Sequence, residues 1–290
     1  MACTIPYQTG RIAIVSDLHI DSYRSAGRDA ITSLGLENVI NDDLDALIIA
    51  GDLCDGPALK WSAALGHLTP HIAPDRIYII PGNHDYFGGM LQDDNLLAQQ
   101  AHSVGAHWAQ KQELCHGDTR FLCCTLWTDF DLLGDRNKAM NIAHRAMRDY
   151  ERIRKIHSVT PGSGLQSQSY MPQIRPSDTV TIHNEHKAWL ESQLMTSHPA
   201  GKAGRTVIVT HHGPSPSTAG PVDGLTPAFH SNMTDLIERF APDAWFFGHS
   251  HRRLRATVRR TDLRNVSAGY CGEFHRSESK EFFETCSWES

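Results

Sequence analysis

Short apolar runs rich in β-branched residues recur along the chain, separated by longer stretches in which polar and apolar residues follow roughly helical spacing. Runs of this kind, bounded by polar residues, predict buried strands. The six runs that we interpret as strands are 11–15, 44–50, 76–80, 120–127, 205–210 and 244–247. The segments between them favour helices at 24–41, 57–67, 90–104, 189–195 and 232–240. This alternation predicts an α/β architecture.

Residues 130–178 interrupt the alternation. Between 134 and 160, seven basic side chains stand against three acidic ones, and residues 139–156 predict one basic amphipathic helix. The stretches Pro161–Gly164 and Gln166–Ser169 then predict a flexible loop. Two interpretations stay open for this insertion: a solvated helix with a linker, or a cap that faces a substrate. The tail from 273 to 290 is polar and predicts no particular element.

Composition excludes several classes of protein. With 290 residues, 40% hydrophobic and 21% charged, the chain matches a soluble globular protein of one large or two smaller domains. No apolar run could span a bilayer, and the first residues lack a signal-peptide pattern. Seven cysteines without a CxxC motif predict reduced thiols in the cytoplasm. The net charge of −6 does not favour extended nucleic-acid binding.

Five of the six predicted strands end in side chains that commonly bind metal ions. These endings are Asp17 and His19, Asp52, Asn83 and His84, His211 and His212, and His249 and His251. Because open α/β sheets bind ligands outside the carboxyl ends of their strands, we expect these side chains to meet. In extended backbone, Asp17 and His19 would also point to the same side. The sequence therefore predicts a site for divalent transition metals.

The order of these motifs resembles that of the calcineurin-like metallophosphoesterases. The motifs are Asp-x-His, Gly-Asp, Gly-Asn-His-Asp, a strand-terminal His and Gly-His-x-His, and the resemblance spans residues 11 to about 270. It implies a single phosphoesterase domain over 1–290 that includes the insertion at 130–178. It also implies a four-layer α/β/β/α sandwich of two mixed sheets flanked by helices, with the metal site at the carboxyl ends of strands.

The resemblance implies a dinuclear centre. Asp17, His19 and His251 would hold the first metal ion, Asn83, His211 and His249 would hold the second, and Asp52 would bridge them. Manganese is the expected metal, although iron and zinc suit the same ligands. A water bound to the metals would be the nucleophile. The net positive charge left by two dications would attract a phosphate.

The resemblance also assigns roles around the metals. His84 would protonate the leaving group as general acid, and Asp85 would orient its ring. Family members use the first histidine after the strand, which favours His211 as the ligand, with His212 beside the substrate. If the insertion is a cap, its arginines could reach a second anionic group of the substrate. The candidate substrate contacts are His212, Arg145, Arg148 and Arg152.

Departures from known subfamilies narrow the expected function. The residues after Asp52 and before Asn83 lack the arginines of the protein serine/threonine phosphatases. Asp55 stands where purple acid phosphatases carry a tyrosine ligand, so we expect it in the turn or behind the ligands. Thr125–Phe130, Met147–Tyr150 and Gly269–Tyr270 are similar to segments of small cytosolic bacterial metallophosphoesterases.

We therefore expect metal-dependent hydrolysis of a phosphoric mono- or diester, a small molecule or a nucleotide, in the cytoplasm. One alternative is a nuclease acting on DNA or RNA, because repair nucleases share these motifs and the insertion is basic. The other is a non-catalytic scaffold of the same fold, which the complete ligand set disfavours. The sequence does not distinguish a phosphatase from a phosphodiesterase, and it does not indicate an oligomeric state.

Overall fold

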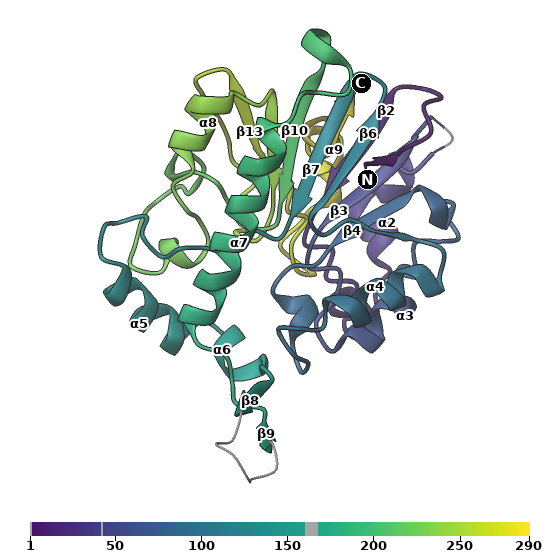
Figure 1. Ribbon diagram of the computed structural model, residues 1–290. Helices are drawn as coiled ribbons and strands as arrows, with labels where there is room; N and C mark the ends of the chain where they lie inside the picture. Colours follow the sequence, from purple (N-terminus) through teal and green to yellow (C-terminus); the bar gives the residue numbers. More distant parts are fainter. Residues whose placement is uncertain (1, 42, 160–167) are drawn as a thin grey trace.

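Two β-sheets lie face to face in the computed structural model, which describes residues 2–41, 43–159 and 168–290 (Figure 1). The larger sheet has the strand order β1-β6-β7-β10-β11-β13-β12, and the smaller one β14-β2-β3-β4-β5. Both sheets are mixed: their central strands are parallel, whereas β6 pairs antiparallel with β7, β12 with β13, and β14 with β2. The bounds of the strands are β1 Cys3–Thr4, β2 Arg11–Val15, β3 Ala46–Ala50, β4 Ile77–Ile80, β5 His107–Trp108, β6 Gln112–His116, β7 Thr119–Cys124, β10 Arg205–Thr210, β11 Ala244–Phe247, β12 Arg255–Val258, β13 Thr261–Asn265 and β14 Ser287–Glu289.

Alternate side chains of the larger sheet enter two different cores. Phe121, Val207 and Phe246 pack into the core between the sheets, together with residues of β2, β3 and β4. The intervening Leu122 and Trp245 face a second core under α7 (Pro176–Met195) and α8 (Thr234–Phe240). Because successive strand residues point to opposite faces, this division makes the larger sheet a buried layer. The predicted α/β fold of two mixed sheets flanked by helices is confirmed.

All six predicted strands form, but several predicted helices are shorter or divided. The stretch 24–41 overlaps only the end of α1 (Ile20–Ser25) and contains α2 (Ala30–Leu34), with Gly27 and Gly35 at positive φ after them. Glycine adopts this conformation readily, so it ends a helix. Residues 57–67 and 90–104 contain α3 (Trp61–Leu65) and α4 (Asp94–Ser103).

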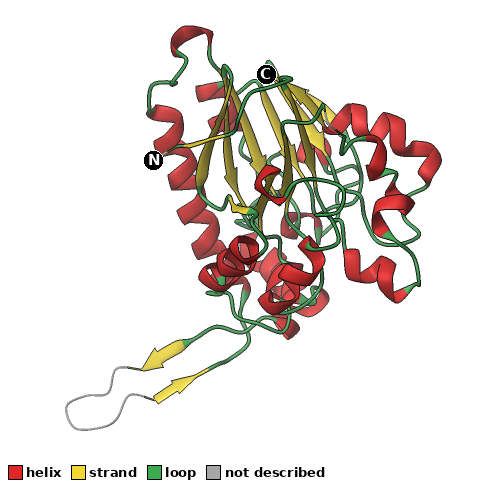
Figure 2. Cartoon of the chain, turned by 90° about the vertical axis from the view of Figure 1, so that its right-hand side faces the viewer, coloured by secondary structure: helices red, strands yellow, loops and turns green. Residues whose placement is uncertain are grey.

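The insertion does not form the single helix predicted over 139–156. Helix α5 (Arg136–Ala146) ends at Met147, whose extended backbone (φ −90°, ψ 131°) turns the chain before α6 (Asp149–Arg152). Asp149 and Tyr150, which follow this turn, are buried. The hairpin of β8 (His157–Val159) and β9 (Gln168–Tyr170) then projects from the body (Figure 2). Of the loop predicted at 161–164 and 166–169, residues 161–164 and 166–167 lie outside the described residues, and residues 168–169 belong to β9.

The tail predicted only as polar is structured. Helix α9 (Ser279–Cys286) buries Phe282, Phe283 and Cys286, and β14 extends the smaller sheet by pairing antiparallel with β2. The apolar residues of the tail are few but lie on one face of the helix, and composition alone does not reveal this arrangement. Among the described residues, no helix is both long and apolar enough to cross a bilayer.

Candidate metal centre

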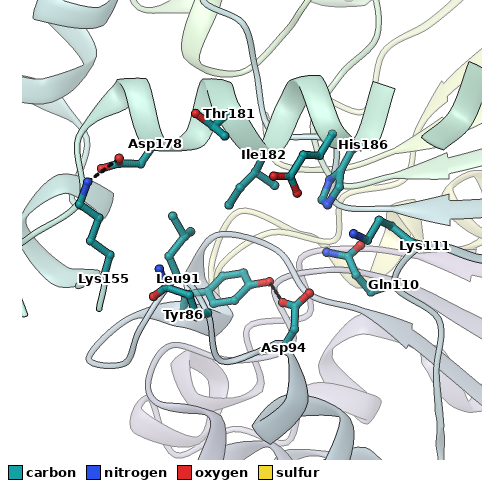
Figure 3. A pocket seen from close by; sticks show the side chains of 12 residues that line it. Tyr86, Leu91, Asp94, Gln110, Lys111, Lys155, Asp178, Thr181, Ile182 and His186 are labelled. Atoms are coloured by element: carbon teal, nitrogen blue, oxygen red, sulfur yellow. Dashed lines mark hydrogen bonds and ion pairs between the residues drawn. The ribbon is translucent and has the colours of Figure 1, made fainter. Parts of the chain in front are cut away.

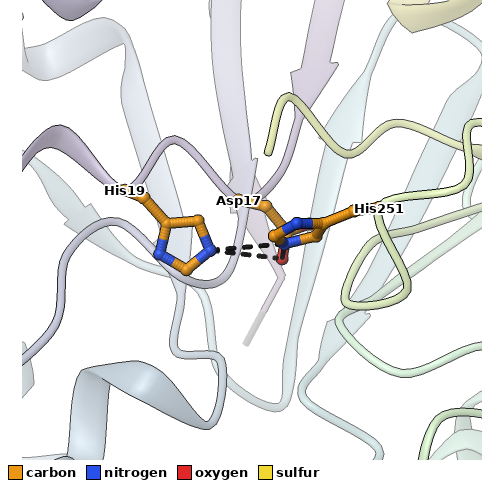
Figure 4. A group of neighbouring side chains, drawn as sticks. All are labelled: Asp17, His19 and His251. Carbon is orange, nitrogen blue, oxygen red and sulfur yellow. Dashed lines mark hydrogen bonds and ion pairs between the residues drawn. The ribbon is translucent and has the colours of Figure 1, made fainter. Parts of the chain in front are cut away.

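The first group of predicted ligands converges behind the carboxyl end of β2 (Figure 4). His251 Nε2 lies 3.2 Å from Asp17 Oδ1 and 3.3 Å from His19 Nε2. The reason we gave for the pairing of Asp17 and His19 is wrong, because β2 ends at Val15 and both residues have positive φ (58° and 38°). A tight loop, rather than strand alternation, brings the two side chains together.

The second group lies at the ends of β3, β4, β10 and β11. His211 Nε2 is 3.0 Å from Asn83 Oδ1 and 3.4 Å from Asp52 Oδ2, and His249 belongs to the same cluster. His249 Nε2 is buried and has no hydrogen-bond partner among the described residues. The structure thus brings all seven predicted ligands into two adjoining groups.

Asp52 connects the two groups. Its Oδ2 atom lies 3.4 Å from His211 Nε2 in the second group and 3.8 Å from His19 Nε2 in the first. Two glycines permit this approach: a Cβ on Gly82 would lie 2.2 Å from Asp52 Oδ1, and one on Gly51 would lie 2.5 Å from His211 Nδ1. Only glycine fits at such distances, so both positions are dictated by the site.

The ligand positions share an uncommon backbone conformation. Asp17, His19, Asp52, His249 and His251 all have φ between 38° and 68°. This left-handed region costs a non-glycine residue about 1–3 kcal/mol, and such residues concentrate at functional sites. Five such residues in one cluster indicate that the fold tolerates an unfavourable backbone conformation because it directs these side chains towards one another.

The donor atoms fit divalent cations. His211 donates its Nδ1 hydrogen to the carbonyl of Ala50 at 2.9 Å, so its Nε2 carries a lone pair that faces the oxygens of Asn83 and Asp52. Histidine ligands of metals characteristically donate their other ring hydrogen in this way. Several lone pairs facing one point repel each other unless a cation lies between them.

His251 has the same arrangement in the first group. The Glu273 carboxylate accepts its Nδ1 hydrogen at 2.7 Å, which turns Nε2 towards Asp17 and His19. Imidazole, carboxylate and amide donors together suit manganese, iron or zinc. These residues therefore fit two divalent transition metals.

Without a bound cation, the negative charge of Asp52 favours the protonated form of the neighbouring histidine His211. Burial disfavours a charged imidazole, but the Asp52 carboxylate outweighs burial and raises the pKa of His211 to about 9. Burial would likewise raise the pKa of Asp52, yet His211 and His84 lower it to about 2. Metal ions that bind here must displace these protons, so the occupancy of the site should fall in acid.

His84 lies beside the predicted metal ligands, but the partner of its ring differs from the predicted one. Its Nδ1 atom donates to Asp55 Oδ1 at 2.6 Å, and the hydroxyl of Tyr270 lies 3.3 Å from its Nε2. The predicted role of Asp85 in orienting this ring is wrong. Asp85 is fully buried and accepts hydrogen bonds from the amides of Asp52, Leu53, Cys54 and Gly82 and from the indole of Trp61.

Asp85 therefore holds the backbone of the two ligand loops together. The sequence predicts that Asp55 lies in the turn or behind the ligands. In the structure, its carboxylate accepts the hydrogen bond that orients the ring of His84. A spacing of three residues from Asp52 is the only sequence signal that could have identified it.

A cavity of about 320 Å³ opens in front of these residues. Asp52, His84, His249 and His251 line it together with Arg148 and Asp149 of the insertion. Additional lining residues that sequence reasoning missed are Met147, Asp149, Phe229, Tyr270 and Glu273. Met147, Asp149 and Tyr270 lie in segments similar to those of small bacterial metallophosphoesterases, which is the sequence signal that could have identified them, whereas no pattern marks Phe229 and Glu273.

Three of the predicted substrate contacts do not line this cavity. His212 is buried, with its ring stacked on Trp127 at 5.0 Å and its Nδ1 atom 3.3 Å from the carbonyl of Thr125. Arg145 is exposed on α5, and Arg152 forms an ion pair with Asp55 at 3.2 Å. Among these candidates, only Arg148 faces the cavity.

A second cavity, of about 380 Å³, lies between α7 and the loop after His84 (Figure 3). Its charged side chains largely offset one another: Lys155 pairs with Asp178 at 2.6 Å, and Lys111 shares the cavity with Glu185. None of the predicted site residues lines it.

Known proteins share both the sequence pattern and the fold. The family model of the calcineurin-like phosphoesterases matches residues 10–253. A Caenorhabditis elegans protein named as a metallophosphoesterase, F40B5.2, is 33% identical over 111 residues, which cover 36% of this chain and 22% of that protein. The match thus spans about a fifth of that relative's length.

Solved structures resemble the whole chain. Phosphopantetheinyl hydrolase (PptH) from Mycobacterium tuberculosis has a TM-score of 0.63 at 16% identity, covering 98% of this chain and 97% of its own. A Staphylococcus aureus protein described as a 5′-nucleotidase has a TM-score of 0.52 at 14% identity, covering 89% of this chain and 49% of its own. At such identities, these similarities establish the fold alone.

The family match extends over most of the chain and includes every group of metal-type ligands that the structure brings together. The family of this chain and its clusters of histidine and aspartate side chains support metal-dependent hydrolysis of phosphoesters. The chain belongs to the calcineurin-like phosphoesterase family.

Proposed function

We propose that this protein hydrolyses small phosphoesters at a centre of two divalent metal ions, with His84 as the general acid. The observation that carries the proposal is the position of Asp52 between the two ligand groups, 3.8 Å from His19 Nε2 and 3.4 Å from His211 Nε2. A carboxylate with two oxygens can serve two ions. Such a pair of ions activates water and stabilises the charge that develops on the phosphoryl oxygens.

The residues of the chain would divide the remaining work. His84 presents Nε2 to the cavity, because its Nδ1 atom is held by Asp55 at 2.6 Å, and Nε2 would give its proton to the leaving oxygen. The hydroxyl of Tyr270, 3.3 Å from Nε2, marks where a hydrogen-bonding oxygen of the substrate fits. Phe229 and Met147 contribute apolar side chains to the lining of the cavity.

Arg148 supports recognition of a second anionic group on the substrate. Its guanidinium is exposed at the wall of the cavity, and it forms no ion pair within residues 2–41, 43–159 and 168–290. A guanidinium binds phosphate or carboxylate with two hydrogen bonds. The cap interpretation of the insertion is thus proposed for Arg148 and not for Arg145 or Arg152.

The nuclease alternative has less support. Of the seven basic side chains of the insertion, Arg136, Arg152 and Lys155 are each paired with a carboxylate of this chain. Cations that are already paired do not add up to a track for a polyanion. A scaffold without activity would not need five ligand residues in a costly backbone conformation, which favours an enzyme.

A hydrolysis panel tests the proposal. Protein reconstituted with manganese, zinc or iron is offered phosphomonoesters, phosphodiesters, cyclic nucleotides and single-stranded nucleic acid. We expect a small ester to be cleaved by wild-type protein and not by Asp52→Asn. Hydrolysis of nucleic acid alone, with a steep loss at higher salt, would support the nuclease instead.

A further inference from the structure

The acid at the metal centre is held by a side chain from the insertion. Arg152 Nη1 lies 3.2 Å from Asp55 Oδ2, while the other oxygen of Asp55 accepts the Nδ1 hydrogen of His84 at 2.6 Å. The three residues thus form one chain, guanidinium to carboxylate to imidazole. Asp55 and His84 are 21% and 13% exposed, so water screens the contacts only partly.

Arg152 also contacts Phe87, the aromatic side chain that packs against the His84 ring. Its guanidinium lies over Phe87, 4.6 Å from the ring centroid, and Phe87 in turn packs against His84 with centroids 4.2 Å apart. The carbonyl of Arg152 accepts the Gly88 amide hydrogen at 2.8 Å, which fixes the backbone of α6 to the loop that carries the ring. One arginine therefore contacts both supports of His84.

We infer that Arg152 is a positioning residue that keeps His84 oriented for proton donation, and this inference rests on the proposed role of His84. The reason is geometric. A carboxylate bound only by an imidazole can rotate, whereas one whose second oxygen is fixed by a guanidinium presents the first in a single direction. With Nδ1 held, Nε2 points into the cavity. If Nε2 pointed elsewhere, only the rate of the step in which the leaving group is protonated would fall.

Three variants distinguish the positioning of His84 by Arg152 from a general structural role of the segment. Arg152→Met keeps an unbranched side chain over Phe87 but removes the charge that binds Asp55. Arg154→Met is the matched control, because Arg154 lies two residues later in the same segment, is exposed and forms no ion pair within the described ranges. Arg152→Lys restores the charge without the planar fork and should recover part of the loss.

The first test compares two esters. Relative to wild type, Arg152→Met should lower kcat/KM about 10-fold on an ester with an alkyl alcohol leaving group and less than 2-fold on a p-nitrophenyl ester. In a His84→Ala background, Arg152→Met should cause no further loss. Equal losses on both esters, losses that add to those of His84→Ala, or no loss at all would overturn the inference.

The second test does not depend on hydrolysis. In zinc-reconstituted protein, the Nδ1 hydrogen of His84 should give a slowly exchanging proton resonance in wild type and Arg154→Met, and this resonance should be lost in Arg152→Met. Its persistence in Arg152→Met would overturn the inference. If the resonance behaves as expected but no ester is cleaved, the proposed function fails while the positioning of His84 by Arg152 stands.

Discussion

Replacing His84 with alanine tests the chemistry most specifically. The change removes the ring that would donate the proton, but it keeps the backbone amide of residue 84, which donates to Asp52 Oδ1 at 2.9 Å. Asp55 keeps its ion pair with Arg152. The ring is 13% exposed at the cavity, so its removal enlarges an existing opening instead of creating a void in the core. We therefore expect both metal ions to remain bound.

The expected size of the effect depends on the leaving group. Loss of a general acid lowers turnover by about 10²–10⁴-fold when the leaving oxygen is a poor one. This corresponds to about 3–5 kcal/mol of activation free energy. A p-nitrophenolate leaves without a proton, so the loss on its ester should stay below about 10-fold.

The assay measures kcat/KM for a series of esters whose alcohols differ in pKa, with the metal content of each preparation determined in parallel. The dependence on leaving-group pKa should be steeper for His84→Ala than for wild type. An equal loss across the series, or a preparation depleted of metal, would refute the role of His84 as an acid and make it a ligand or a structural residue.

Three further changes test other parts of the account. Asp45 accepts hydrogen bonds from the amides of residues 8–10 and from His116, so Asp45→Asn should lower the free energy of unfolding by about 2–3 kcal/mol at pH 7 in urea titrations. Burial raises the pKa of Asp45, but these hydrogen bonds lower it well below its usual range. Its stabilisation is therefore complete above about pH 4, and the difference from wild type should shrink as the pH falls; a constant difference would contradict this. Arg148→Glu should raise KM about 10-fold for a substrate with a second anionic group and leave a p-nitrophenyl ester unaffected, with Arg145→Glu as the matched control; equal effects of the two would remove Arg148 from the substrate site. Tyr270→Phe removes the hydroxyl 3.3 Å from the acid and should lower kcat about 3- to 10-fold with unchanged metal content. Lost metal would instead show that this hydroxyl supports the metal site, since phenylalanine keeps the ring that stacks on His19 at 4.1 Å.

The strands and the convergence of the metal-type side chains could be predicted because they depend on local patterns. Apolar runs such as Ile77–Ile80 are unambiguous, and each ends at residues of recognisable type. The geometry of the ligands could not be predicted in the same way. Asp17 and His19 converge through positive φ values that their residue types disfavour, and only the surrounding contacts stabilise that conformation.

The surroundings of His84 were harder to predict, because they depend on contacts between distant parts of the chain. Asp85 adjoins the histidine in sequence, yet the turn directs it into the loop amides, and Asp55 takes its place. Arg152 lies 97 residues from Asp55 in sequence, and the helix α6 that carries it begins after the chain turns at Met147. Helical periodicity does not reveal such a turn, so the insertion was interpreted as one continuous helix.

The number of metal ions that the protein binds decides whether the proposed dinuclear centre exists. The claim is that Asp52 joins two metal sites, and the measurement is elemental analysis of wild-type protein and two variants after reconstitution with manganese and removal of free metal. We predict two ions per chain in wild type and in Asp45→Asn, which alters a buried carboxylate that is not among the predicted ligands, and fewer than one in Asp52→Asn. A wild-type protein without stoichiometric metal, or an Asp52→Asn variant that keeps both ions, would contradict the account.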